Sequence, residues 1–315
     1  MNIGVVTVTY SDRRKYLFKM LESLIYHNIT VVTVVCNGVS KEVFDSIEKY
    51  SAQLPYQTTL VYSPNNLGSA GGFKKGINQS PEHLDFLLLL DDDNTLSNSA
   101  SLNDILKSED YSDYNIYYIK RPSREAITYS YSSRRMDFMI GEPNSVLGKS
   151  FIPSNPEYTN KGLKSDLLVA PYGGLILNKK VLNEKILPNE KLFLYADDYE
   201  YTYRLVTREG YSIKFIDELI VVDIEDSHHL RSKNKFWHTR FSSSNEMQIY
   251  YAVRNQLYFD KLRVNNLYKF YLNYIFVGGY FISSFALSLD AKRLKIFMKA
   301  YREGVNERFI CNMKE

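Results

Sequence analysis

Residues 86–95, FLLLLDDDNT, join a continuous apolar run to three consecutive aspartates. The run is too short to cross a membrane, but its composition suits a strand buried on both faces of a parallel sheet. Asp91, Asp92 and Asp93 would then lie at the carboxyl end of that strand, where open α/β sheets bind ligands. Because adjacent carboxylates repel one another, a hard divalent cation such as Mg²⁺ or Mn²⁺ suits them best. The stretch therefore predicts a metal-dependent site rather than an exposed acidic turn.

Two metal-dependent chemistries fit these aspartates. As Asp-x-Asp they suit a nucleotide-sugar transferase whose metal bridges a diphosphate. As Asp91-x-Asp93-x-Thr95 they also fit the motif of haloacid-dehalogenase-like phosphatases, in which the first carboxylate is a nucleophile. The motif alone leaves both open.

The overall composition is that of a globular protein. The 315 residues are 44% hydrophobic and 24% charged, and the net charge of +3 gives no reason to expect a nucleic-acid partner. Cys36 and Cys311 are far apart and have no metal-binding spacing, which favours a reducing compartment. The first residues lack the layout of a signal peptide and are typical of a strand. We therefore expect a cytoplasmic protein.

Strands and helices alternate before the aspartates. This order predicts a central, mostly parallel sheet with right-handed crossovers, flanked by helices. A glycine-rich segment, 65–73, follows the third strand, and its glycines would let the backbone approach a ligand at a helix N-terminus. It is not the dinucleotide-binding GxGxxG pattern, so we expect no Rossmann cofactor. The expected strands are 3–9, 30–36 and 59–62. Helices are expected at 41–52 and after Asp12, which can cap the helix that follows it.

A second acidic cluster follows about a hundred residues later. The apolar stretch 167–177 is interrupted by Gly173 and Gly174, and a helix then begins near Asp197, Asp198 and Glu200. The helix dipole stabilises acids there, but a helix cap accounts for only one of the three. A further strand, 212–224, leads to His228 and His229, which are candidate metal ligands.

The chain is expected to end in aromatic helices that begin near Tyr250. Residues 270–289 carry no charge and are long enough to cross a membrane, but they include several polar residues. Residues 290–308 are basic, with apolar positions at helical spacing. This pattern predicts an interfacial helix on an anionic membrane surface. A spanning helix and a soluble or dimer-forming tail remain alternatives.

Together these motifs resemble the inverting glycosyltransferases of family 2, which have the GT-A fold. The resemblance covers residues 3–260 and rests on five motifs in the same order: Val8–Arg13, Asn66–Phe73, Asp91–Asp93, Asp197–Leu205 and Tyr251–Asn255. It implies a catalytic domain at 1–260 and a helical tail at 261–315. Cys36 stands where many relatives have an aspartate, so the resemblance does not say how the nucleotide base is read.

The resemblance also implies roles for individual residues. Asp198 would be the catalytic base of a single displacement with inversion, with Asp197 and Glu200 binding the acceptor. Mn²⁺ or Mg²⁺ would be held by Asp91, Asp93 and His228, the last favoured narrowly over His229. The implied donor-binding residues are Thr9, Tyr10, Arg13, Asn37, Asn66, Gly68, Gly71, Gly72, Asp91, Asp92, Gly173 and Gly174.

The segment Asn66–Phe73 is most similar to the galactofuranosyltransferase branch. The implied donor is UDP-galactofuranose, with dTDP-rhamnose as the alternative, and the acceptor is a growing surface polysaccharide or a lipid-linked glycan. The expected location is the inner face of the cell membrane, and the C-terminal helices are a candidate surface for self-association. The phosphatase is less favoured because that family places its motif near the N-terminus. A non-enzymatic glycan-binding protein is less favoured because every acidic motif is present.

Overall fold

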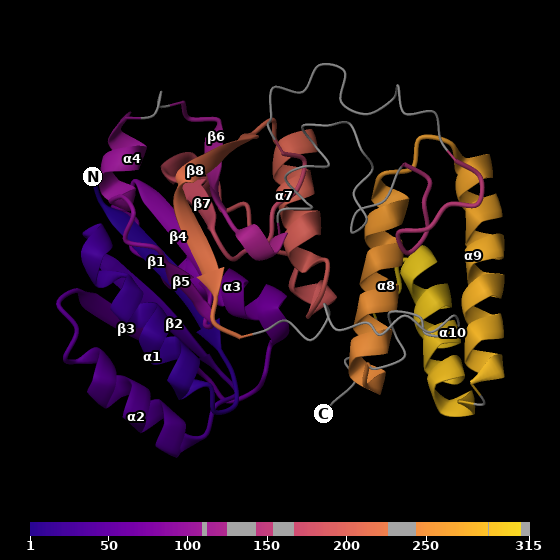
Figure 1. Ribbon diagram of the computed structural model, residues 1–315, viewed down its shortest axis with the longest axis horizontal. Coiled ribbons are helices and arrows are strands. Elements are labelled where there is room, and N and C mark those ends of the chain that lie inside the picture. Colours follow the sequence, from indigo (N-terminus) through magenta and orange to yellow (C-terminus); the bar gives the residue numbers. More distant parts are fainter. Residues whose placement is uncertain (109–111, 125–142, 154–166, 226–243, 289, 310–315) are drawn as a thin grey trace. The chain divides into compact units, whose positions relative to one another are not determined.

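The computed structural model describes residues 1–108, 112–124, 143–153, 167–225, 244–288 and 290–309. The chain forms two compact units (Figure 1). The first, here the sheet unit, comprises Met1–Thr128, Leu163–Glu190 and Asp197–Asp226. The second, here the helical unit, comprises Tyr129–Gly162, Lys191–Ala196 and Ser227–Glu315.

The described part of the sheet unit contains an eight-stranded mixed sheet of order β3-β2-β1-β4-β7-β6-β8-β5. β1 to β4 form a parallel half, as predicted, and β6 and β8 are also parallel. β7 is antiparallel to both β4 and β6, and β5 is antiparallel to β8. The strands are β1 (Ile3–Thr9), β2 (Val31–Asn37), β3 (Gln57–Ser63), β4 (Phe86–Asp91), β5 (Asn94–Leu96), β6 (Asn115–Lys120), β7 (Leu175–Asn178) and β8 (Ser212–Asp223).

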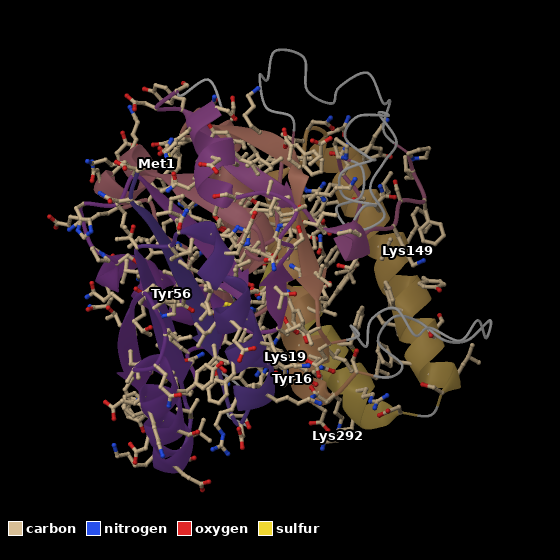
Figure 2. All side chains as sticks on the ribbon, turned by 60° about the vertical axis from the view of Figure 1, so that its left-hand side comes forward. Met1, Tyr16, Lys19, Tyr56, Lys149 and Lys292 are labelled. Atoms are coloured by element: carbon tan, nitrogen blue, oxygen red, sulfur yellow. The ribbon has the colours of Figure 1, made fainter. Side chains whose placement is uncertain are left out.

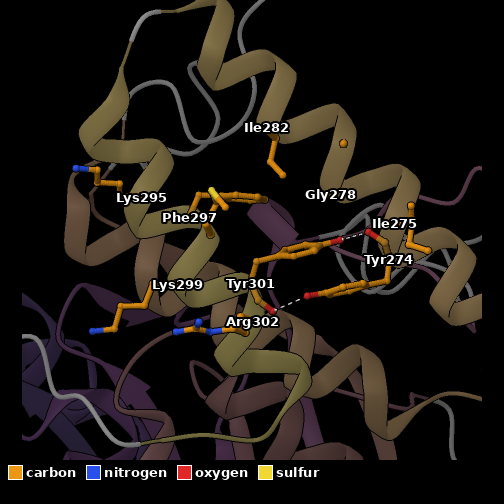
Figure 3. Close-up of a pocket in the computed structure, with 11 residues that line it drawn as sticks. Tyr274, Ile275, Gly278, Ile282, Lys295, Phe297, Lys299, Tyr301 and Arg302 are labelled. Atoms are coloured by element: carbon orange, nitrogen blue, oxygen red, sulfur yellow. Dashed lines mark hydrogen bonds between the residues drawn. The ribbon is translucent and has the colours of Figure 1, made fainter.

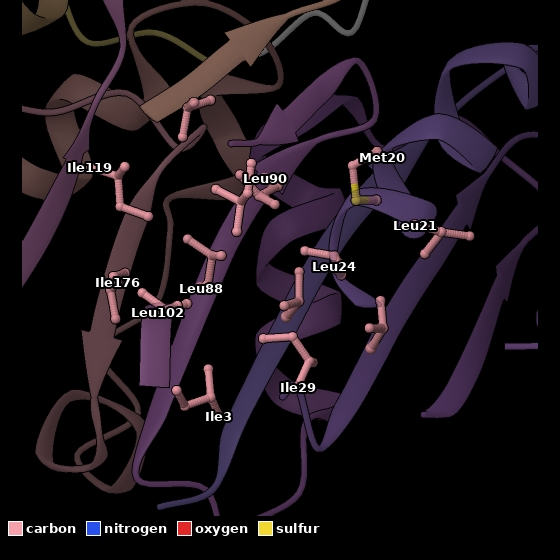
Figure 4. Packing of buried hydrophobic residues seen from close by; sticks show 14 of the residues in the cluster. Ile3, Met20, Leu21, Leu24, Ile29, Leu88, Leu90, Leu102, Ile119 and Ile176 are labelled. Carbon is pink, nitrogen blue, oxygen red and sulfur yellow. The ribbon is translucent and has the colours of Figure 1, made fainter. Parts of the chain in front are cut away.

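The core of this unit follows from the alternation of side chains along its strands. In β1, Ile3 and Val5 belong to a core cluster that also holds Leu17 and Leu21 of α1 (Figure 4). The other face of α1 carries exposed polar residues such as Lys19 (Figure 2). The helices and short 3₁₀ turns are α1 (Arg14–Ser23), η1 (Ile25–His27), α2 (Lys41–Ser51), α3 (Gly68–Gln79), α4 (Leu102–Ser108), η2 (Pro122–Arg124), α6 (Lys179–Asn183), η4 (Glu190–Leu192) and α7 (Asp197–Thr207).

The predicted glycine-rich segment lies mostly inside α3. A Cβ at Gly72 would come within 2.5 Å of Val8 Cγ1, and one at Gly76 would overlap Val6. Both valines belong to β1, so these glycines let the helix pack closely against the sheet. Gly68, at the start of the helix, has φ +70° and needs the conformational freedom of glycine.

The helical unit is built from α8 (Glu246–Leu262), α9 (Leu267–Leu287) and α10 (Ala291–Val305). Asn245 and Gln248 form a capping box at the start of α8. The buried face of α9 packs with α8 and α10 in one cluster, because its apolar positions recur at helical spacing. The predicted boundary at residue 260 falls inside α8, so the compact units divide the chain differently from that prediction. The cluster includes Tyr250, Leu257, Phe270, Val277, Phe281, Phe285, Phe297 and Tyr301.

Helix α9 is long and apolar enough to cross a membrane, judged by length and composition alone. Its most apolar window has a mean hydropathy of 1.3, and 33% of that window is buried within the protein. A packed helix of a soluble unit passes the same test, so this finding leaves the choice among the predicted membrane arrangements open.

Candidate active site

The carboxyl ends of the parallel strands bring several predicted residues to one edge of the sheet. Val8 of β1 pairs with Asp91 of β4, and Thr9 pairs with Cys36 of β2. Thr9, Asn37 and Asp91 therefore end three adjacent strands. This is the edge at which open α/β sheets bind ligands.

Asp92 is the most buried of the three aspartates, with only 4% of its surface exposed. Thr9 Oγ1 donates to one carboxylate oxygen at 2.7 Å, and Arg13 Nε donates to the other at 2.9 Å. Burial raises the pKa of Asp92 to about 7, although Arg13 opposes the shift. The other end of the Arg13 guanidinium pairs with Glu225 at 2.8 Å. Asp92 thus anchors Arg13 at the sheet edge, a contact that the sequence did not predict.

Asp91 and Asp93 are more accessible, and each contacts one arginine. The Asp91 side chain is 41% exposed and lies 3.3 Å from Arg121 Nη1. Asp93 lies 3.2 Å from Arg13 Nη2. Burial, together with the negative charge of Asp91, raises the pKa of Asp93 to about 6. A cation shared by these two carboxylates would relieve that repulsion.

The two carboxylates fit part of a divalent metal site. Their oxygens are hard ligands, and Mg²⁺ is commonly held by one or two carboxylates that leave room for phosphate oxygens. Within the described ranges, no group of three or more His, Cys, Asp or Glu side chains is arranged to hold a metal. The predicted third ligand, His228, and its neighbour His229 lie outside the described residues.

Arg121 is a residue of this edge that the sequence analysis missed. It follows β6, is 5% exposed, and donates to Asp223 through Nε at 2.9 Å and Nη2 at 2.5 Å. Asp223 ends β8, the parallel neighbour of β6. The available signal was a charged residue at the carboxyl end of a strand, Arg121 after β6 and Asp223 at the end of β8, like Asp91 at the end of β4. The sequence analysis also missed Glu225 as a partner of Arg13, because no local sequence pattern marks it.

The predicted Gly173 and Gly174 support this ion pair. A Cβ at Gly173 would overlap the Arg121 guanidinium and come within 2.8 Å of Asp91 Oδ2. Gly174 has φ +105° and donates its N–H to Leu89 of β4 at 2.9 Å. The pair of glycines therefore leaves space beside Asp91 that other residues would fill.

Asn37 and Asn66 shape the turn that leads into α3. The Asn37 amide donates to Asn66 Oδ1 and to the Gly68 carbonyl, each at 3.1 Å, and its oxygen accepts the Leu67 N–H at 2.8 Å. These two predicted donor-binding residues thus fix the conformation of the turn. Tyr10, by contrast, is 47% exposed at the end of β1.

The acidic cluster lies at the start of α7, as predicted. Asp197 is 2% exposed, and Ser69 Oγ of α3 donates to it at 2.7 Å. Burial raises the pKa of Asp197, and the charges of Asp198 and Asp91 add to the shift. Ser69 lies in the first turn of α3, and Asn37 at the end of β2 holds the turn into that helix. Both acidic motifs therefore lie at the same edge of the sheet.

The other two acids of the cluster differ in environment. Asp198 is half-buried, and its Oδ1 accepts the Tyr199 N–H at 2.8 Å. Glu200 is buried and pairs with Arg204 at 3.0 Å. Arg204 also donates to the Leu187 carbonyl, so Glu200 helps to fix the helix within the unit.

Comparisons with known proteins agree with this geometry. Residues 4–187 match the family described as "Glycosyl transferase family 2". No curated protein matches the sequence. The crystal structure of S. aureus TarS 1–349 superposes with a TM-score of 0.52 at 15% identity, covering 98% of this chain and 82% of that one. GalNAc-T7, crystallised with UDP, GalNAc and Mn²⁺, superposes with a TM-score of 0.56 at 13% identity.

The GalNAc-T7 match covers 96% of this chain and 54% of that one, so the chain spans about half of that relative. At these identities the two structures indicate the fold alone, which is GT-A. The family match covers more than half of the chain, and with it the phosphatase interpretation is set aside. The chain belongs to glycosyl transferase family 2 and is a glycosyltransferase with the GT-A fold.

Proposed function

We propose that this glycosyltransferase moves a sugar from a nucleoside-diphosphate donor to an acceptor hydroxyl by direct displacement, with inversion at the anomeric carbon. The supporting observation is that both acidic motifs lie at the carboxyl edge of the parallel strands: Asp91 ends β4, and Asp197 is bound by Ser69 in the first turn of α3, the helix whose start is held by Asn37 at the end of β2. One acidic motif is therefore available for the departing diphosphate, and the other for the incoming hydroxyl. A single displacement needs both, on opposite sides of the sugar.

Asp198 is the proposed general base. An acceptor hydroxyl is a weak nucleophile, so a carboxylate must take its proton as the new bond forms. Asp197 is buried and accepts the Ser69 hydroxyl, which suits a supporting role. Glu200 is engaged by Arg204. Asp198 is half-buried, whereas Asp197 and Glu200 are buried, so an acceptor has a path to Asp198.

Asp91 and Asp93 are the proposed protein ligands of Mn²⁺ or Mg²⁺, with His228 as the third. A bound divalent cation would stabilise the negative charge of the departing diphosphate. Arg13 and Arg121 contact the same carboxylates and hold them at the edge of the sheet. GalNAc-T7 was crystallised with UDP, GalNAc and Mn²⁺, which supports the same type of donor and metal here.

The proposed donor is UDP-galactofuranose, with dTDP-rhamnose as the alternative, and the proposed acceptor is a surface-polysaccharide or lipid-linked glycan. This choice depends on the resemblance of Asn66–Phe73 to one branch of the family. Turnover of a panel of nucleotide sugars by the full-length protein tests it directly. UDP-galactofuranose should be consumed fastest, and a preference for a UDP-hexopyranose would contradict the assignment.

The inverting mechanism has its own test, which does not depend on the donor assignment. NMR of the product formed from the preferred donor should show an anomeric configuration opposite to that of the donor. Retention would exclude a single displacement. The same reactions in EDTA should stop and should recover on addition of Mn²⁺ or Mg²⁺, whereas full activity in the chelator would exclude the proposed metal.

A further inference from the structure

Within the helical unit, a cavity of about 630 Å³ lies between α9 and α10. Its floor is formed by aromatic rings, with Tyr274 stacked on Tyr301 at 4.3 Å between ring centroids (Figure 3). Tyr301 Oη donates to the Tyr274 carbonyl at 2.6 Å, and Tyr274 Oη donates to the Tyr301 carbonyl at 3.4 Å. These reciprocal bonds tie the two helices together. The spacing of α9 and α10 along this groove, here the α9–α10 groove, is therefore fixed by contacts within the protein.

Gly278 contributes to the shape of this groove. A Cβ at this position would come within 3.0 Å of the Tyr301 ring, so a larger residue would push the ring away from its place on the floor. The sequence analysis gave Gly278 no role. In the structure it lets α9 accept the aromatic side chain of α10.

One rim of the groove is positively charged. Lys295, Lys299 and Arg302 line it from α10 (Figure 3), and no ion pair joins any of them to a described carboxylate. No acidic side chain lines the groove. Elsewhere in the same helix, Lys292 pairs with Glu246 and Arg293 with Asp290. Within the described helical unit these three cations thus form no ion pair, and Lys299 instead lies 5.3 Å from the centroid of the Tyr250 ring.

Apolar side chains lie exposed beside these cations. Ile275 is 65% exposed, Ile282 37% and Met298 51%, and all three line the groove. An apolar surface next to unpaired lysine and arginine side chains is the pattern of helices that lie in a membrane interface. We propose that the α9–α10 groove binds the anionic surface of a phospholipid membrane. This inference concerns the location of the enzyme and does not depend on the sugar that it transfers.

A second copy of the chain is a less suitable occupant. A symmetric dimer places the same surface on both sides of its interface. Here that would bring the three rim cations of each copy towards those of the other, with no carboxylate in the groove to balance them. Like charges brought together in this way cost free energy. An anionic lipid surface supplies the missing negative charge.

A membrane-spanning α9 is also less suitable, because polar contacts hold its buried face. Asn273 Oδ1 accepts the N–H groups of Phe151 and Ile152, at 2.9 and 2.8 Å, and its amide donates to the Asn144 carbonyl at 3.0 Å. Three backbone groups of a non-helical segment thus depend on this face of α9. Such a segment is not tolerated in contact with lipid. An α9 that lies on the surface can keep these contacts.

Vesicle binding by the full-length protein tests the proposal. Sedimentation would compare vesicles of pure phosphatidylcholine with vesicles that also contain phosphatidylglycerol. We expect salt-sensitive binding to the anionic vesicles only. Each cation near such a surface contributes about fivefold in affinity. The triple variant Lys295→Gln/Lys299→Gln/Arg302→Gln should therefore bind about a hundredfold more weakly.

A matched control removes the same charge from the sheet unit. Lys41→Gln/Lys49→Gln/Lys180→Gln lowers the net charge by an equal amount and should bind like wild type. In the groove, Ile275→Ser/Met298→Ser should weaken the binding that remains at high salt. Circular dichroism would confirm that each variant is folded. Point substitutions are preferred to deleting the tail, because α9 and α10 supply much of the helical core.

Several outcomes would overturn the proposal. Wild-type affinity in the groove triple variant, or equal binding to neutral vesicles, would show that the groove does not recognise an anionic surface. Retention of the natively produced protein in membranes through an alkaline carbonate wash would show a spanning helix. Light scattering that finds a dimer broken by Ile275→Ser would assign the face to a second copy. Donor hydrolysis by the triple variant should remain at the wild-type rate, which separates this test from that of the proposed function.

Discussion

The arginines of the two units have different partners. In the sheet unit, Arg13 and Arg121 each pair with carboxylates, and Arg121 joins Asp91 and Asp223. In the helical unit, Arg254 is fully buried and donates to neutral oxygens. It donates to Asn255 Oδ1 at 2.8 Å and to the carbonyls of residues 191 and 192 at 3.0 and 3.1 Å.

The arginines of the sheet unit balance charge, whereas Arg254 supports the backbone. At the sheet edge, the arginines balance the negative charge of the aspartates. A metal ion could replace an arginine as the partner of such a carboxylate. Arg254 instead binds a segment that runs directly into Asp197. Asn255 donates to three carbonyls of that segment, at 2.7, 2.7 and 3.0 Å.

The bound segment needs such support. Phe193, Tyr195 and Ala196 have φ of +66°, +67° and +58°. A left-handed conformation costs a non-glycine residue about 1–2 kcal/mol, so these residues persist only where other contacts hold them. In the helical unit, buried side-chain donors therefore stabilise the backbone of residues 191–196. In the sheet unit, Arg13 and Arg121 balance the charge of the aspartates at the sheet edge.

The largest expected effect lies in the sheet unit, at Asp198. Asp198→Asn should lower transfer by about 10²–10⁴-fold, the usual loss for a general base, with donor binding kept. Steady-state kinetics and donor titration would measure both quantities. Asp217→Asn, at an exposed position of the same unit, is the control. More than a tenth of wild-type turnover in Asp198→Asn would show that another residue is the base.

A smaller but pH-dependent effect is expected at Arg121. Arg121→Met leaves Asp223 buried without its partner, and breaking a buried ion pair costs about 3–5 kcal/mol of unfolding free energy. Arg121 also lowers the pKa of Asp93, so Asp93 should bind a proton more readily once the arginine is gone, and part of this loss should be recovered as the pH is lowered from 7 to 5. Urea unfolding at both pH values would measure the recovery. An equal loss at both would mean that charge balance is not the role of Arg121.

Arg254→Met should cost about 1.5–3 kcal/mol, the range for hydrogen bonds that involve a charged group. Because its recorded acceptors are carbonyl and amide oxygens, the loss should be the same at pH 5 and pH 7. This pH independence is what distinguishes it from Arg121→Met. Asn255→Leu should lower stability in the same way. If acid restored stability to Arg254→Met, the contrast between the two units would fail.

A last effect, expected in the unmodified, metal-free protein, is a pH dependence of its stability. Asp92 and Asp93 have pKa values raised to about 7 and about 6 in the folded state. Between the unfolded pKa, near 4, and these values, the folded chain binds protons that the unfolded chain has released. These groups therefore lower stability as the pH rises through that window, by at most about 1.4 kcal/mol per pH unit for each group. Urea unfolding from pH 4.5 to 7.5 would measure the slope.

Addition of Mn²⁺ should oppose this loss, because a cation favours the ionised carboxylates. The double variant Asp92→Asn/Asp93→Asn should lose most of the slope, and Asp217→Asn should keep it. A slope of the opposite sign in the metal-free protein would mean that ion pairing with Arg13 outweighs burial at these aspartates.

The sequence by itself determined the features that local pattern encodes. Continuous apolar runs and the βαβ order predicted the parallel half of the sheet, and the acidic clusters after β4 and at the start of α7 were correctly located. These features depend on residues close together in the chain. One local prediction was wrong: Asp12 does not cap α1, whose N-cap is Arg13 with no side-chain bond, because Asp12 pairs with Arg14 instead.

Only the tertiary structure decided which distant residues meet. β7 inserts antiparallel between β4 and β6, and this brings Arg121 to Asp91, thirty residues away in the chain. Gly72 is required by contact with Val8 of β1, and Asn255 by the carbonyls of residues 192–195. No periodicity or motif encodes such pairs, because each depends on the register and packing of elements that the sequence places far apart.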